Sequence, residues 1–515
     1  MNTLLPRCCG LFALLACAGE PPAATPPPLD ALPALPGAAA SSEGPRGEAR
    51  PARYLSLALV GEVRGEIEPC GCPTLPYGGF ARRGALLDRL REEEPLLHID
   101  AGELLLKGAS TARAADRARR GEALLSLSEA VGLDLWVPGP TDLLALGPDG
   151  LRAPRGFPTI SATWTLEGAP LLSPTAILEA GGLRVGVIGL SGELRGEDRV
   201  ATLDPVLAAR AALAGLPADL DLVLAIGSVD DALADRVARE VEGLPLVLST
   251  KGSAYEALRQ PERPDGSLGA VVIEAPDRGR YVQRVELRIA GPAAGPIRPP
   301  ADPLRWQERR DLVGRLRRSP DDAALQARGA ALEAALDEEG RGRILVATST
   351  IPLSEDLDPP GGPVRAQVDR FHADTQAAAV ARAAAPPPPT VPTYATASAC
   401  VSCHTKQMSR WALTDHARAW ESLLARQSTQ NPECVGCHST GFGEPGGFGD
   451  PAAASALRFK AVQCEACHGP MAGHPDDGKK PPAVTIDTCT GCHDAANSPE
   501  FAFGRYLQRA TCQSR

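Results

Sequence analysis

Eight of the 14 cysteines fall into one repeated pattern, in which two cysteines three positions apart are followed directly by a histidine. The four copies are CVSCH (Cys400, Cys403, His404), CVGCH (Cys434, Cys437, His438), CEACH (Cys464, Cys467, His468) and CTGCH (Cys489, Cys492, His493). Two thiols one turn apart can add to the two vinyl groups of a porphyrin, while the adjacent histidine reaches the iron. The spacing therefore predicts four covalently bound haem c groups, attached through the eight cysteines, with the four histidines as proximal iron ligands.

Zinc sites and disulfides are the two other chemistries that use closely spaced cysteine pairs. A zinc site does not need a histidine directly after every pair. A disulfide within Cys-x-x-Cys closes a very small loop, so it constrains the unfolded chain little. The repeated histidine therefore favours haem over both alternatives.

Two further histidines, His416 and His474, lie within the same part of the chain. Both are predicted as distal ligands because imidazole is a common axial ligand of haem iron, although an isolated histidine is more often an ordinary surface or core residue. Met408 and Met471 are weaker candidates, since a methionine more often serves packing.

The N-terminus has the features of an export signal. Arg7 precedes a short apolar run, and the stretch LLAC that ends at Cys17 resembles a bacterial lipobox. These features predict a lipoprotein signal peptide over 1–17 and a lipid-anchored Cys17; ordinary cleavage in the following Ala-rich stretch is the alternative. Residues 18–52, rich in Pro, Ala, Gly and Ser, are predicted to be a disordered linker. We therefore expect an exported protein, periplasmic or at the cell surface, held on a bacterial membrane by its lipid.

Composition limits the remaining function classes. With 515 residues, 43% of them hydrophobic, the chain can form two or three domains with buried cores. The net charge is -10 and the lysines and arginines are spread along the chain, so no nucleic-acid partner is predicted.

Residues 53–300 are predicted to form an α/β domain. Strand-like apolar runs recur between helical stretches rich in Ala, Leu and Arg, which argues for β-α-β units. The runs are YLSLALVG, LLHIDAG, LDLWVPG, LRVGVIGL, LDLVLAIGS and LPLVLST. Two later runs, LGAVVIEA and RYVQRVELRI, are expected to form a closing hairpin.

The rest of the chain divides into three parts. A helical connecting region is predicted over 301–385, with a further strand in RILVATSTIPL. A stiff Pro-rich linker follows over 386–392. The four CxxCH motifs then occupy a cytochrome domain over 393–515.

The order and spacing of the motifs resemble a known family. CVSCHTKQMSRWALTDHARAW, CVGCHSTGFG, CEACHGPMAGH and CTGCHDAANSPEFAFGRYLQRAT are similar to the tetrahaem cytochromes c that include the electron carriers of ammonia-oxidising bacteria. The resemblance implies a mostly helical, loop-rich domain with a core made of haem. It implies His474 opposite the iron of His404 and His416 opposite the iron of His468. It also implies a five-coordinate haem at His438.

The iron of His493 is where this chain departs from the family. Related sequences have a histidine near the C-terminus, whereas this chain reads RATCQSR. Cys512 falls at roughly that position, so either thiolate ligation or an open site is expected at the fourth haem.

The order of runs over 54–290 resembles the calcineurin-like metallophosphoesterases, in particular the periplasmic 5'-nucleotidase branch. Those enzymes hold two metal ions with Asp, His and Asn at strand ends. Here the first strand end reads VGEVRGE in place of Asp-x-His, the second carries Glu103, and the third carries Asp142 without Asn-His. We therefore expect a metallophosphoesterase-like sandwich whose metal ligands have been lost.

Cys70 and Cys72 lie just after the first predicted strand, separated by one glycine. A structural disulfide or an incidental pair is the simpler interpretation. The alternative is a redox-active or metal-binding dithiol, because a Cys-x-Cys ring is strained and reducible, and Arg82 and Arg83 can lower a thiol pKa.

The expected function is electron transfer between redox donor and acceptor proteins in an exported chain of carriers. The alternative is a haem oxidoreductase acting on a small nitrogen or sulfur compound at the open His438 haem, a substrate class suggested by family analogy only. A metal-dependent phosphoesterase is the third and least favoured hypothesis.

Overall fold

The computed structural model describes residues 52–69, 76–106, 114–194, 199–250, 258–276, 278–290, 297–359, 361–385, 393–425, 428–478, 480–493, 498 and 500–510. The predicted signal peptide, nearly all of the predicted linker 18–52 and the Pro-rich segment 386–392 lie outside these ranges, as do Cys17, Cys70, Cys72 and Cys512. No helix in the described ranges combines the length and the hydrophobicity that a bilayer crossing requires.

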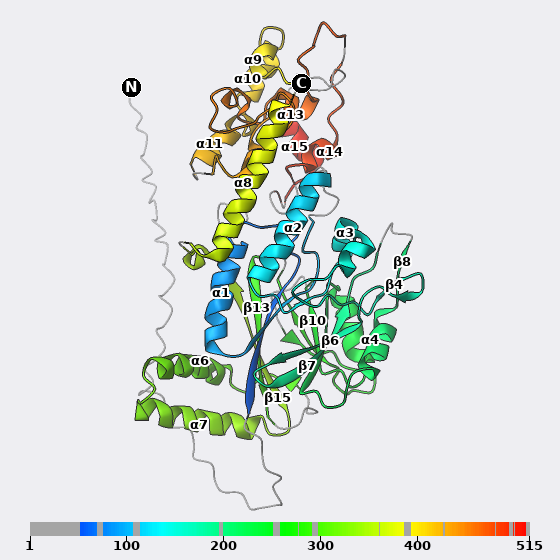
Figure 1. Ribbon diagram of the computed structural model, residues 1–515, viewed down its shortest axis with the longest axis vertical. Helices are drawn as coiled ribbons and strands as arrows, with labels where there is room; N and C mark the ends of the chain where they lie inside the picture. Colours follow the sequence, from blue (N-terminus) through cyan, green and yellow to red (C-terminus); the bar gives the residue numbers. More distant parts are fainter. Residues whose placement is uncertain are drawn as a thin grey trace, which may run out of the picture.

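Two six-stranded sheets form the α/β region (Figure 1). The first has the order β14-β15-β13-β1-β2-β3, in which β1, β2 and β3 are parallel and β13 runs antiparallel to β1. Its strands are β1 (Arg53–Val60), β2 (Leu96–Asp100), β3 (Leu135–Trp136), β13 (Tyr281–Ile289), β14 (Ile297–Arg298) and β15 (Ile344–Pro352).

The second sheet has the order β11-β12-β10-β9-β7-β6, with a parallel centre made of β7, β9, β10 and β12. Its strands are β6 (Thr175–Ala180), β7 (Leu183–Leu190), β9 (Leu222–Gly227), β10 (Leu246–Ser249), β11 (Leu258–Arg259) and β12 (Val271–Glu274). A small third sheet contains β4 (Trp164–Leu166), β5 (Ala169–Pro170) and β8 (Val200–Thr202).

The main core lies between the two large sheets. Alternate residues of β1, namely Leu55, Leu57 and Leu59, pack there against Leu224 and other residues of the second sheet. The intervening Ala58 points to the other face of the first sheet, where it belongs to a second hydrophobic cluster beneath the helices that cover this face. Those helices are α1 (Phe80–Glu93), α2 (Ala114–Ala130), α3 (Pro140–Arg152) and α8 (Pro363–Ala384). On the other side α4 (Pro205–Ala214) and α5 (Asp231–Glu240) cover the second sheet, so the layers are helix, sheet, sheet and helix.

The fold class and all six predicted strand runs are confirmed, but the predicted closing hairpin is wrong. LGAVVIEA supplies β12 of the second sheet and RYVQRVELRI supplies β13 of the first. The two runs are adjacent in the chain, yet each is buried along nearly its whole length and takes an interior position in its own sheet. In β13 the buried residues include Arg284, Glu286 and Arg288, whose charges are compensated by ion pairs. The chain therefore crosses from one sheet to the other at this point.

The predicted connecting region, 301–385, contributes to the same sandwich. The strand expected in RILVATSTIPL is present as β15, which pairs with all nine residues of β13. Before it, α6 (Pro303–Arg318) and α7 (Ala323–Glu339) form a helical hairpin. Asp322 caps α7 by accepting hydrogen bonds from two backbone N–H groups.

Helix α8 joins the sandwich to the C-terminal region (Figure 1). It packs on α1 and α2, and its C-terminal half contacts α12. The Gln376 side chain donates to the Gly449 carbonyl at 3.3 Å, and the Ala383 carbonyl accepts from the Gly446 N–H at 3.2 Å. One continuous helix thus holds the two parts of the molecule together.

The stability of the α6–α7 hairpin depends on one tryptophan. Trp306 of α6 is 1% exposed and packs with Leu312, Leu332 and Leu345. Replacing Trp306 with Ala should lower the free energy of unfolding by about 3–5 kcal/mol, because a large buried side chain is lost. Leu304→Ala in the same helix is the control, since Leu304 is 71% exposed. Urea unfolding followed by circular dichroism measures both, and equal costs would contradict the packing.

Candidate functional site

The four CxxCH motifs adopt the same helical turn. The second lies within α12 (Pro432–His438) and the third forms α13 (Cys464–His468). In the first and fourth motifs the histidine N–H donates to the carbonyl of the first cysteine, with distances of 2.9 Å for His404 and 2.8 Å for His493. Positions i, i+3 and i+4 share one face of a helix, so each motif presents two thiols and an imidazole to one side.

All four motifs face a single cavity of about 3210 Å³. Its lining includes all eight motif cysteines and all six histidines of the C-terminal region. This volume is several times that of an ordinary small-molecule pocket, which is about 300–1,000 Å³. The described residues therefore fit several porphyrins, each bound through two sulfurs and one imidazole.

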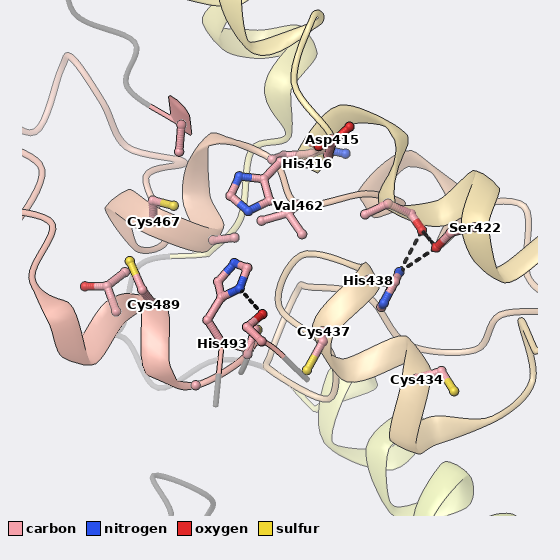
Figure 2. Close-up of a pocket in the computed structure, with 18 of the residues that line it drawn as sticks. Asp415, His416, Ser422, Cys434, Cys437, His438, Val462, Cys467, Cys489 and His493 are labelled. Carbon is pink, nitrogen blue, oxygen red and sulfur yellow. Dashed lines mark hydrogen bonds between the residues drawn. The ribbon is translucent and has the colours of Figure 1, made fainter. Parts of the chain in front are cut away.

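Two pairs of imidazoles meet across this cavity. The ring centroids of His404 and His474 lie 6.3 Å apart with an interplanar angle of 28°. Those of His416 and His493 lie 5.9 Å apart, and Figure 2 shows the two rings directed toward each other. A metal that takes one nitrogen from each ring at about 2 Å holds the two centroids roughly 6 Å apart. Both pairs therefore have the spacing that bis-histidine iron requires.

The resemblance implied His474 opposite the iron of His404 and His416 opposite the iron of His468. In the structure the ring of His474 lies beside that of His404, and the ring of His416 lies beside that of His493. The backbone explains the difference, because the His416 carbonyl accepts a hydrogen bond from the Val462 N–H at 3.1 Å. This bond holds the His416 segment next to the chain that enters α13, and Figure 2 shows the His416 ring directed toward His493.

Burial favours the neutral form of His416. Desolvation lowers its pKa, the nearby His493 lowers it further, and Asp415 acts in the opposite direction. A neutral imidazole is the form that binds a metal.

Hydrogen bonds orient two of the proximal histidines (Figure 2). Nδ1 of His438 lies 2.7 Å from the Ala419 carbonyl and 3.1 Å from the Ser422 hydroxyl. Nδ1 of His493 lies 2.7 Å from the Ser498 hydroxyl. When Nδ1 carries the proton and donates it to these oxygens, Nε2 is left for iron, which is the usual arrangement around metal-bound histidine. No sequence pattern had pointed to these three partners.

Glu465, inside the third motif, was also missed. Its carboxylate is 3% exposed and accepts backbone hydrogen bonds from Ala395, Thr396 and Met471 at distances of 2.8–3.0 Å. These bonds tie the chain leading to the first motif onto α13. The first and third motifs are therefore held side by side by one buried carboxylate.

The α/β sandwich supplies one wall of the same cavity. The wall contains the loop after β1 and the loop after β2, together with several arginines. Those arginines are Arg64, Arg82, Arg117, Arg120, Arg278, Arg280 and Arg365. Arg64, Arg82 and Arg365 pair with carboxylates of the protein itself, so this wall is charged but internally compensated at those positions.

The strand ends where the metallophosphoesterase resemblance would place metals are occupied by internal contacts. Asp142 accepts from the backbone N–H of Leu105 at 2.8 Å and of Gly139 at 2.9 Å. Asp100 lies 3.9 Å from the buried guanidinium of Arg83, and Glu103 accepts from Thr141. In the described part of the chain, no group of three or more His, Cys, Asp or Glu side chains is placed to hold a metal ion. His98 is 1% exposed within β2.

The geometry above is that of a multihaem c-type cytochrome region carried by an α/β sandwich. The family model described as cytochrome c554 and c-prime matches residues 399–469. Cytochrome c-554 of Nitrosomonas europaea is 38% identical over 96 residues, which cover 16% of this chain and 40% of that relative. The C-terminal part of the chain is thus a cytochrome c554-type domain, a type that carries covalently bound haem c. The chain spans less than half the length of this relative.

Solved structures similar to the chain include two phosphoesterases. The 5'-nucleotidase precursor of Thermus thermophilus has a TM-score of 0.46 and 19% identity, covering 63% of this chain and 59% of its own. A calcineurin-like phosphoesterase of Bacillus subtilis has a TM-score of 0.42 and 15% identity, covering 63% and 98%. These similarities concern the fold of the sandwich.

The pairing of His404 with His474 leads to a spectroscopic prediction. In the matured protein, His474→Ala should remove the second imidazole from one iron and convert one low-spin haem to high spin. His372→Ala is the control, because His372 lies on α8, where its ring approaches Glu68 at 3.7 Å. Electron paramagnetic resonance quantifies both spin states, and an unchanged low-spin signal in the His474 variant would refute the pairing.

Asp142 leads to a prediction about the pH dependence of stability. Burial raises its pKa from 3.8 to about 8, and the neighbouring Glu103 adds to this. The folded protein then keeps a proton that the unfolded chain releases, so unfolding becomes easier as the pH rises from about 4 to 8, by at most about 1.4 kcal/mol per pH unit. Asp142→Asn cannot titrate, so its stability should vary less with pH than that of the parent between pH 5 and pH 8, although the amide can accept only one of the two backbone hydrogen bonds. The exposed Asp149→Asn in α3 is the control, and identical slopes for the parent and Asp142→Asn would contradict the prediction.

Proposed function

We propose that this chain is an exported electron-transfer protein that carries four covalently bound haems. The two imidazole pairs at iron-spanning distance carry the proposal, because six-coordinate iron with two protein ligands exchanges electrons without binding substrate. Haem supplies the reversible one-electron chemistry. The chain holds each iron, fixes its imidazoles through hydrogen bonds and keeps the four sites in one cavity.

The rest of the proposal concerns location and partners. The LLAC stretch at Cys17 supports lipid attachment to a bacterial membrane, in the periplasm or at the cell surface. The partners would be a redox donor and a redox acceptor protein. The α/β sandwich then serves as a rigid wall for the haem cavity and, through α8, as the support of the cytochrome region.

A second candidate function is catalysis at the haem of the second motif. Among the described residues, His438 has no imidazole facing its ring, although its Nδ1 is firmly held by Ala419 and Ser422. An iron bound only by this histidine has a position for a small nitrogen or sulfur compound. The other haems would then deliver or remove the electrons.

A haem count combined with a redox titration tests the main proposal. The matured full-length protein should give four haems per chain in a pyridine haemochrome assay and take up four electrons in a reductive titration. Replacing Cys434 and Cys437 together with Ala should reduce both numbers to three, since one attachment site is lost. Cys512→Ala, outside the motifs, is the control and should leave both at four. Colourless protein, or protein containing zinc in place of iron, would contradict the proposal.

A further inference from the structure

The carboxylate of Glu465 is a buried anion that only the backbone holds. The residue is 3% exposed, and its side chain accepts hydrogen bonds from the N–H groups of Ala395, Thr396 and Met471 at 2.8–3.0 Å. Among the described residues no lysine or arginine forms an ion pair with it. A carboxylate whose partners are all N–H donors uses its oxygens only as acceptors, which is what the ionised form does. The structure therefore holds a negative charge inside the third motif.

The chain that leads to the first motif is shaped around this charge. Thr396 has φ of 81° and ψ of 157°, a backbone conformation that residues other than glycine adopt only where their surroundings hold it. Gln463, which is 6% exposed, assists Glu465, because its side-chain carbonyl accepts the next N–H, that of Ala397, at 2.7 Å. The two side chains that flank Cys464 thus bind three consecutive N–H groups, and the charge has a built site between the first and third motifs.

The same charge acts on the first motif. Burial raises the pKa of the Cys400 thiol, the negative charge of Glu465 raises it further, and a hydrogen bond with Cys464 acts in the opposite direction. The first cysteines of the first and third motifs therefore lie beside each other, within the field of Glu465. When both sulfurs are bonded to porphyrins, the charge that acts on the thiol acts on the haem at that position.

We propose that Glu465 is a fixed negative charge that lowers the reduction potentials of the two haems attached at the first and third motifs. The inference rests on the haem attachment proposed above and adds a residue that biases the direction of electron flow. Reduction gives each iron one electron from the donor protein, and no bond forms or breaks. A buried anion makes this step less favourable, because little water screens its charge. Glu465 thereby favours transfer of electrons from these two haems to those of the second and fourth motifs.

A redox titration of the matured full-length protein, followed by visible absorption, tests this role. Glu465→Gln removes the charge and keeps the length of the side chain. Two of the four midpoint potentials should rise, each by roughly a tenfold change in the reduction equilibrium, or about 59 mV for one electron. Both shifts should persist when Cys434 and Cys437 are replaced with Ala, which removes only the second haem. Glu421→Gln, at an exposed position of α11 (Ala419–Leu424), is the matched control and should move no potential.

Glu465→Asp separates the charge from the hydrogen bonds. Aspartate keeps the charge but has a shorter reach, so the bonds weaken while the potentials should stay close to those of the parent. Potentials that are unchanged or lowered in Glu465→Gln, or raised in Glu465→Asp, would overturn the inference, and four haems with four electrons would still support electron transfer. If Glu465→Gln does not mature, the aspartate variant decides alone by the same criterion. Protein without haem would overturn both proposals.

Discussion

The distance between paired imidazoles, which matches what one iron between them would require, is the constraint on which the proposed cytochrome region depends. The first motif and His474 are 70 residues apart in the chain, and His416 and the fourth motif are 77 residues apart, yet both pairs of rings lie about 6 Å apart. The helices of this region are short, from four to eight residues, and such helices are marginal in water on their own. Their arrangement around one shared cavity fits a region in which iron and porphyrin take the place of a conventional core. The small apolar cluster of Trp420, Phe448 and Phe459 supplements that core.

The sandwich and the cytochrome region meet through α8 and through the walls of the cavity. Helix α8 packs on the outer helices of the first sheet and bonds to the loop around Gly446. The strand ends of β1 and β2, which in open α/β sheets are the usual place for ligands, face this cavity. The carboxylates of Glu103, after β2, and of Asp142, in α3 after β3, are bonded to the protein itself. The polar groups at these strand ends thus hold the loops in place.

Much of this architecture follows from patterns that are local in the chain. The strand runs, the α6–α7 hairpin and the motif turns were predictable, because hydrophobic periodicity and cysteine spacing act over a few residues. The placement of β12 and β13 in different sheets was not predictable. Two strand-like runs that follow each other in the chain do not reveal which sheet each one joins. The partner of His416 depended on a backbone bond to Val462, and the roles of Ser422 and Ser498 depend on tertiary contacts. None of these has a signature in the sequence.

Diffraction from crystals of the matured protein at the iron absorption edge tests the account most directly. The account predicts four anomalous peaks inside the shared cavity, one between His404 and His474, one between His416 and His493, and one each beside His438 and His468. Peaks at the zinc edge in place of the iron edge, or an iron between His416 and His468, would contradict it.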